Sequence, residues 1–164
     1  ANVMNDRLLL AGMLSSATLI NRFFPPGQVY KDFYESSENL FDLLQFPDIW
    51  MLGYFKWELE FLETLGFGLD LEKCTVTGSR EDLKFVSPKS GCAVSQAAAG
   101  DWSSKLLPYP VAASGQVNSL EDILDGLKVS QFFLERKVLT AFGMEQLPNA
   151  RSRFIYLLEK KIRN

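Results

Sequence analysis

The chain has 164 residues and a mass of 18.5 kDa, the size of one domain, with 47% apolar and 23% charged residues. It contains no histidine, which excludes a Ser-His or Cys-His nucleophile, an imidazole general base and a histidine-ligated metal. The net charge of −3 gives no overall attraction to nucleic acid or to an anionic membrane. No apolar stretch is long enough to cross a bilayer, so we expect a cytoplasmic protein without a membrane partner.

The first third of the chain predicts three helices. The first covers Val3–Phe24 and should be stopped by Pro25–Gly27, and the second covers Val29–Phe46. Asp48 is a suitable cap for the third helix, which covers Ile49–Leu65.

The third helix carries one apolar stripe at three- and four-residue steps. Its members are Ile49, Leu52, Phe55, Leu59, Leu62 and Leu65. We expect Glu58, Glu60 and Glu63 to lie on the solvated side, without forming an acid–base pair. Lys56 and Trp57 also lie off the stripe. The rings of this helix are therefore either core or the wall of a groove that takes an acidic, apolar-ended peptide.

The segment over residues 70–118 differs in composition, because it is rich in Ser, Gly, Thr and Pro. Two short runs that favour β structure, at 83–87 and 92–95, flank turn residues at 88–91 and predict a small hairpin leaning on the helices. The expected fold class is mainly α, a helical domain with a small β-hairpin insert.

Two further helices are predicted in the last third of the chain. One begins at Ser119, with Asp122 in place of the usual Glu of a capping box, and ends before Gly143. The last helix follows Pro148 and continues to the end of the chain.

The final fourteen residues carry five basic side chains and one acidic side chain. The basic residues are Arg151, Arg153, Lys160, Lys161 and Arg163. One reading is a solvated helix end, where the helix dipole favours basic side chains. The other is a surface that contacts the phosphates of DNA.

The two cysteines lie at the ends of the predicted hairpin region, where zinc ribbons hold their metal on two Cys-x-x-Cys turns. Here the second positions of these turns are Thr77 and Ser95, after Cys74 and Cys92 respectively. Hydroxyls are poor zinc ligands, so we expect no metal. The thiols are then buried and structural, or form a transient redox pair.

The sequence contains no glycine-rich phosphate loop, no nucleophile elbow and no persuasive carboxylate pair. We therefore expect neither an enzyme nor a cofactor, since chemistry requires positioned proton-transfer groups.

Several motifs resemble the RecO family of bacterial DNA repair proteins. The most specific is Glu60–Cys74, followed by Thr77–Gly78. The runs Phe85–Gly91, Ala93–Ser95 and Leu147–Arg153 extend the likeness over most of the chain.

The resemblance implies that residues 1–164 are the C-terminal helical domain of such a protein, with the family's N-terminal OB-fold absent from this chain. The insert then looks like a zinc ribbon that has lost half its cysteines. The implied function is that of a recombination mediator in the RecF pathway, at the bacterial nucleoid. Its implied partners are single-strand-binding protein (SSB), RecR, the RecA filament and single-stranded DNA. Its implied actions are to assist RecA loading together with RecR and to anneal strands.

The resemblance also implies a site for the acidic C-terminal tail of SSB, which ends in an apolar residue with a free carboxylate. The matching positions here are Phe55, Lys56, Leu59 and Leu62. Two alternatives stay open: a helical scaffold that supports an OB-fold without a ligand of its own, and direct binding of single-stranded DNA by the basic tail.

Overall fold

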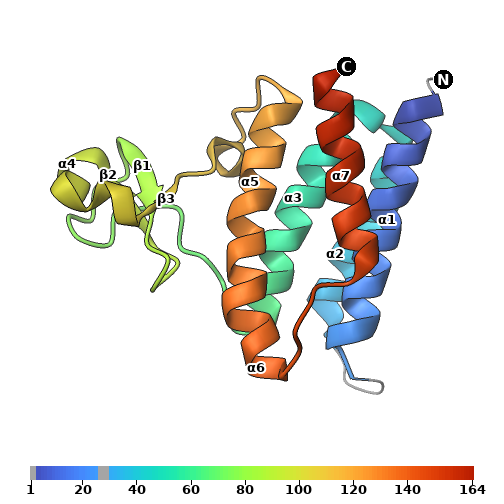
Figure 1. Cartoon of the computed structure of the whole chain (residues 1–164), viewed down its shortest axis with the longest axis horizontal. Helices are drawn as coiled ribbons and strands as arrows, with labels where there is room; N and C mark the ends of the chain where they lie inside the picture. Colours follow the sequence, from blue (N-terminus) through green and yellow to red (C-terminus); the bar gives the residue numbers. More distant parts are fainter. Residues whose placement is uncertain (1–2, 26–29) are drawn as a thin grey trace.

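The computed structural model describes residues 3–25 and 30–164 and shows a bundle of helices with a small β segment projecting to one side (Figure 1). The long bundle helices are α1 (Val3–Phe23), α2 (Lys31–Asp42), α3 (Pro47–Thr64), α5 (Leu120–Phe133) and α7 (Asn149–Arg163). A 3-10 turn, η1 (Leu43–Gln45), follows α2, and α5 continues through the π-helical turn η4 (Leu134–Leu139) into α6 (Thr140–Phe142). The start of α1 and the end of α7 lie at the same end of the bundle.

The projecting segment joins α3 to α5. Its strands are β1 (Leu83–Val86), β2 (Ala93–Ser95) and β3 (Leu107–Pro108), and its short helices are α4 (Gln96–Ala99), η2 (Gly100–Lys105) and η3 (Val111–Ser114). The predicted fold class, mainly helical with a small β insert, is confirmed. In the described part of the chain, no helix combines the length and the hydropathy that crossing a membrane requires.

Helix α3 lies at the centre of the bundle, in contact with α1, α2 and α5. Its large rings are buried, and those with an N–H group have an acceptor. The indole of Trp50 donates to the Leu40 carbonyl at 2.9 Å, and the indole of Trp57 donates to Ser37 Oγ at 2.9 Å. Rings with satisfied polar groups thus form much of the core around α3.

The predicted single stripe on α3 is wrong in two respects. Ile49 is 53% exposed, whereas Tyr54, Trp57 and Glu58 are buried. A one-sided stripe describes a helix on a surface, but α3 is covered from several sides and so buries residues around most of its circumference.

Helix α1 approaches α3 closely at Gly12. A Cβ at this position would lie 2.4 Å from Cη2 of Trp50 and 3.1 Å from Cε1 of Phe154 on α7. Glycine therefore allows α1 to pack against both helices at a distance that no larger residue permits.

The predicted hairpin is confirmed. Strand β1 pairs antiparallel with β2, with Val86 opposite Ala93, and the connecting turn is closed by the hydrogen bond from Gly91 N to Ser87 O at 2.8 Å. Gly91 has a φ of +73°, which favours glycine. Strand β3 on the other edge of β1 was not predicted, because two residues ending in a proline carry no strand pattern.

The helix ends agree with prediction only in part. Helix α1 ends at Phe23; most of the predicted stop at Pro25–Gly27, and the predicted start at Val29, lie outside the described residues. Asp48 lies in the first turn of α3 and is not its cap, since Phe46 holds that position. The Asp122 carboxylate accepts from the backbone N–H of Asn118 at 2.9 Å, one residue earlier than a capping box requires.

Candidate functional site

A groove of about 520 Å³ lies between α2, α3 and the start of the insert. Its apolar lining includes Leu40, Leu43, Trp57, Leu59, Leu69 and Leu71. Lys56 is exposed at its edge, and Leu59 lies beside it, half-buried. Two of the four positions predicted to hold a peptide tail therefore line one groove.

The charges around this groove are mixed. Lys56 is the basic residue of the lining, and no ion pair to another described residue engages it. Glu60, Glu63 and Glu72 also line the groove. An acidic ligand would thus be attracted at one point and repelled elsewhere.

The other two predicted positions belong to the core. Phe55 and Leu62 are both fully buried and do not line the groove. The Phe55 ring lies against Gly126 of α5, where an added Cβ would come within 2.8 Å of it. Both side chains therefore pack in the bundle interior and hold α3 in place.

The five basic residues of α7 do not form one surface. Arg153, Lys160 and Arg163 are exposed, whereas Lys161 is half-buried. Arg151 is 1% exposed, so the prediction that it contacts DNA is wrong. Its guanidinium points into the bundle, where the carboxylate of Glu58 neutralises it.

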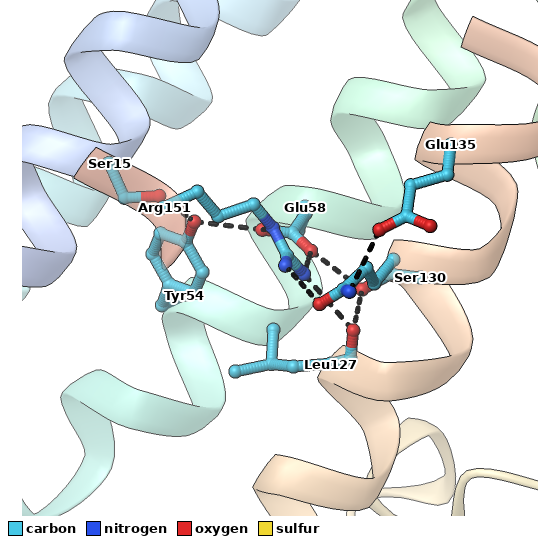
Figure 2. Close-up of polar contacts among 8 residues, drawn as sticks. Ser15, Tyr54, Glu58, Leu127, Ser130, Glu135 and Arg151 are labelled. Carbon is cyan, nitrogen blue, oxygen red and sulfur yellow. Dashed lines mark hydrogen bonds and ion pairs between the residues drawn. The ribbon is translucent and has the colours of Figure 1, made fainter. Parts of the chain in front are cut away.

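Figure 2 shows the polar contacts around Glu58 and Arg151 in the bundle interior. Arg151 Nε donates to Glu58 Oε2 at 3.1 Å, and Nη2 donates to Glu58 Oε1 at 2.5 Å and to the Leu127 carbonyl at 3.0 Å. Ser130 Oγ and Tyr54 Oη also donate to the carboxylate, at 2.6 Å and 2.8 Å. Two opposite charges are thus buried together, and each oxygen of the carboxylate accepts two hydrogen bonds.

The polar cluster links α1, α3, α5 and α7 through hydrogen bonds, most of which Figure 2 draws. Tyr54 of α3 shares a 2.7 Å hydrogen bond with Ser15 of α1. On the other side, Arg151 Nη1 of α7 donates to Gln131 of α5 at 2.8 Å, and Gln131 donates to Glu135 at 2.9 Å. No buried side-chain N or O atom lacks a partner among the described residues. The cluster therefore fixes the relative positions of these helices.

The cluster shifts the ionisation of two of its members. Burial, followed by the nearby Glu58 carboxylate, raises the pKa of Tyr54 well above its usual value. For Arg151, burial acts to lower the pKa, but the Glu58 carboxylate outweighs it and raises the pKa above the usual value. Both residues therefore keep their ordinary charge at neutral pH.

Sequence reasoning missed this cluster and placed Glu58 in solvent. A signal was present, because Tyr54, Trp57 and Phe61 stand within one helical turn of Glu58 and place aromatic rings on its side of the helix. Its partner lies 93 residues away on α7, so the pair could not be matched by spacing.

The two thiols have different surroundings. Cys74 is 1% exposed, and Cys92 is half-buried; both are free. Burial raises the pKa of the Cys74 thiol, but hydrogen bonds from Thr77 and Ser95 outweigh it and lower this pKa to about 6. Ser95 N lies 3.3 Å from Cys74 Sγ. Thr77 and Ser95, which stand where a zinc ribbon has its other two cysteines, thus both contact the Cys74 thiol. In the described part of the chain, no group of three acidic or cysteine side chains is arranged to hold a metal ion.

The fold and this site define a helical domain with a cysteine-containing β insert, a peptide-sized groove and a basic last helix. The family described as "Recombination protein O C terminal" matches residues 4–143. Proteins named DNA repair protein RecO from Ruegeria sp. and Cereibacter sphaeroides are 44% and 42% identical over 97% and 96% of the chain. A third, from Roseobacter denitrificans, is 38% identical over 99%. The chain belongs to the RecO family.

The chain spans 66% of the length of the Ruegeria and Cereibacter proteins and 68% of the Roseobacter protein. No solved structure shows a significant match to it.

Proposed function

We propose that the chain acts in DNA repair as the helical part of a RecO-type recombination mediator, through noncovalent contacts with partners at the bacterial nucleoid. The observation that carries the proposal is the 44% identity over 97% of the chain to a protein named DNA repair protein RecO. The partners we propose are SSB, RecR and the RecA filament. The proposed outcome is assisted RecA loading and strand annealing.

The proposed contact with SSB is the groove beside Lys56 and Leu59. An acidic tail that ends in an apolar residue has two chemical features to satisfy. The terminal carboxylate can pair with the Lys56 ammonium, and the apolar side chain can bury itself on the leucine-lined floor.

The acidic residues of the groove restrict the direction of the tail. Glu60 and Glu63 follow Lys56 by one and two helical turns on α3, and Glu72 lies in the segment after α3. Like charges in contact are unfavourable, so the acidic stretch of the tail should leave the groove on the side away from these glutamates. Only the last residues of the tail then enter it.

The proposed direct contacts are therefore Lys56 and Leu59. Phe55 and Leu62 act behind them as core residues that hold α3 in place. Trp57 is buried but borders the groove, where its ring adds to the apolar floor.

A fluorescent SSB-tail peptide tests this proposal. We expect it to bind the unaltered chain, to bind more weakly as salt rises, and to lose about tenfold in affinity with Lys56→Ala. Lys128→Ala is the matched control, because Lys128 is exposed on α5 and does not line the groove. Equal losses in the two variants, or no binding at any salt, would reject the groove as the tail site.

Direct binding of single-stranded DNA is a second candidate, supported by the exposed face of α7. Arg153, Tyr156, Lys160 and Arg163 follow one another at steps of three and four residues, and all four are exposed. Proteins that bind single strands without sequence preference combine basic side chains, which contact the phosphates, with aromatic rings, on which the nucleobases stack. Tyr156, 52% exposed, was not among the predicted contacts.

Titration with a single-stranded oligonucleotide tests this candidate. Neutralising two phosphate contacts with Lys160→Gln and Arg163→Gln should weaken binding and reduce the slope of log K against log salt by about 1.4. An unchanged slope would reject this surface. If neither the peptide nor DNA binds, the remaining function is that of a scaffold for an OB-fold.

A further inference from the structure

A second groove, separate from the one beside Lys56, lies on the outside of the bundle between α1 and α7. Its volume is about 240 Å³, and its walls come from Arg7, Leu10 and Leu14 of α1 and from Arg153 and Leu157 of α7, together with two alanines. Every charged residue of the lining is basic, and every other residue is apolar.

The leucines of this groove are unusually accessible. Leu10 is 68% exposed and Leu14 is 56% exposed, one helical turn apart on α1. Helix α1 packs into the core through other residues, such as Leu8 and Leu19, so Leu10 and Leu14 contribute little to its packing. Adjacent exposed apolar residues with charged residues around them mark a surface that contacts another molecule.

The two arginines are available for a ligand. Neither Arg7 nor Arg153 forms an ion pair or a hydrogen bond with another described residue. The nearby acidic residue of α1, Asp6, does not line the groove. Two guanidinium groups on facing helices therefore border an apolar strip and bear no counter-charge of their own.

From this combination we infer that the α1–α7 groove docks an acidic peptide segment that carries leucine-like side chains. Arg7 and Arg153 bind its carboxylates, and its apolar side chains lie against Leu10, Leu14 and Leu157. The groove is smaller than the roughly 300–1,000 Å³ of sites that enclose a whole small molecule, but it has room for one or two side chains. Leucines also offer no flat ring for a nucleic-acid base, so a peptide fits better than a DNA strand.

The test is a titration of the full chain with a fluorescein-labelled peptide in which aspartates flank two leucines. We expect binding that weakens with salt, a loss of at least tenfold with Arg7→Gln/Arg153→Gln, and a similar loss when the leucines of the peptide are replaced by serine. The matched control Lys160→Gln/Arg163→Gln removes the same charge from α7 outside the groove and should retain most of the affinity.

Three results would overturn the inference. They are no binding by the unaltered chain, an equal loss in the control double variant, and displacement by a single-stranded oligonucleotide that itself depends on Arg7. Lys56→Ala separates this site from the SSB-tail groove. Unchanged binding of the aspartate–leucine peptide to that variant keeps the two proposals independent, whereas its loss would assign the peptide to the Lys56 groove.

Discussion

Among the described side chains, Glu58 and Arg151 are the charged residues buried in the bundle interior. Each is at most 1% exposed, and each is the other's counter-charge. A buried ion pair contributes little net stability compared with an apolar pair, but the loss of one partner leaves a charge that neither water nor protein compensates. Removing one of the two residues should therefore cost more stability than replacing both with a well-packed apolar pair.

Glu58→Gln should destabilise the chain by about 3–5 kcal/mol, because the Arg151 guanidinium would stay buried without a carboxylate. Urea unfolding should show a lower midpoint at an unchanged slope. Glu60→Gln, on the half-buried side of the same helix, is the control and should change stability by about 0.5 kcal/mol at most. Similar midpoints for the two variants would contradict the role given to the buried pair.

Cys74 makes stability depend on pH. Hydrogen bonds from Thr77 and Ser95, acting against burial, lower the pKa of its thiol in the folded chain from the usual 9.0 to about 6. A lowered folded-state pKa contributes stability that is complete above pH 9 and is lost as the pH falls through about 6.

The difference in unfolding free energy between the unaltered chain and Cys74→Ala should therefore shrink between pH 9 and pH 6. Below that range it should level off at the part due to packing alone. Unfolding curves measured across this range would give the answer. Cys92→Ala controls for the loss of a thiol, and a difference for Cys74→Ala that is constant with pH would contradict the account.

At the scale of elements, helix positions are readable from sequence because buried residues recur with the helical period. The helices ending before Gly143 and beginning after Pro148 match the structure, as does the hairpin. What the period does not reveal is how many sides of a helix are covered. For α3 this number decided the outcome, since Trp57 is buried against α2, the preceding helix, whereas Glu58 is buried against α5 and α7.

Gly12→Ala tests the close approach of α1 to α3. Alanine has the higher helix propensity, by about 1 kcal/mol, so propensity alone predicts stabilisation. The added Cβ would lie 2.4 Å from Cη2 of Trp50, and we expect a net loss of about 1–3 kcal/mol from the forced displacement of the ring or helix. Thermal unfolding of the variant and the unaltered chain measures this change in stability. Ala17→Gly, at an exposed position of α1, calibrates the propensity term, and a stabilised Gly12→Ala would contradict the packing described here.

At the scale of the whole molecule, the fold class and the family were predictable because they depend on pattern and on motifs contiguous in sequence. The site was predictable only in part. Lys56 and Leu59 both line the groove, although the apolar spacing placed Leu59 on the predicted stripe with Phe55 and Leu62. Phe55 is separated from the groove by packing against α5 and Leu62 by its burial in the core, and the burial of Arg151 depends on a partner on α3. The α1–α7 groove joins residues of the first and last helices, which no local pattern connects.

For the whole molecule, we propose that the groove beside Lys56 and Leu59 docks an acidic, apolar-ended tail. Calorimetric titration with the SSB-tail peptide, with and without its final apolar residue, tests it most directly. We expect the complete tail to bind and the shortened tail to bind at least tenfold more weakly, because the leucine-lined floor of the groove would then be left unfilled. Equal affinities for the two peptides, or no heat of binding with the complete tail at low salt, would contradict the claim.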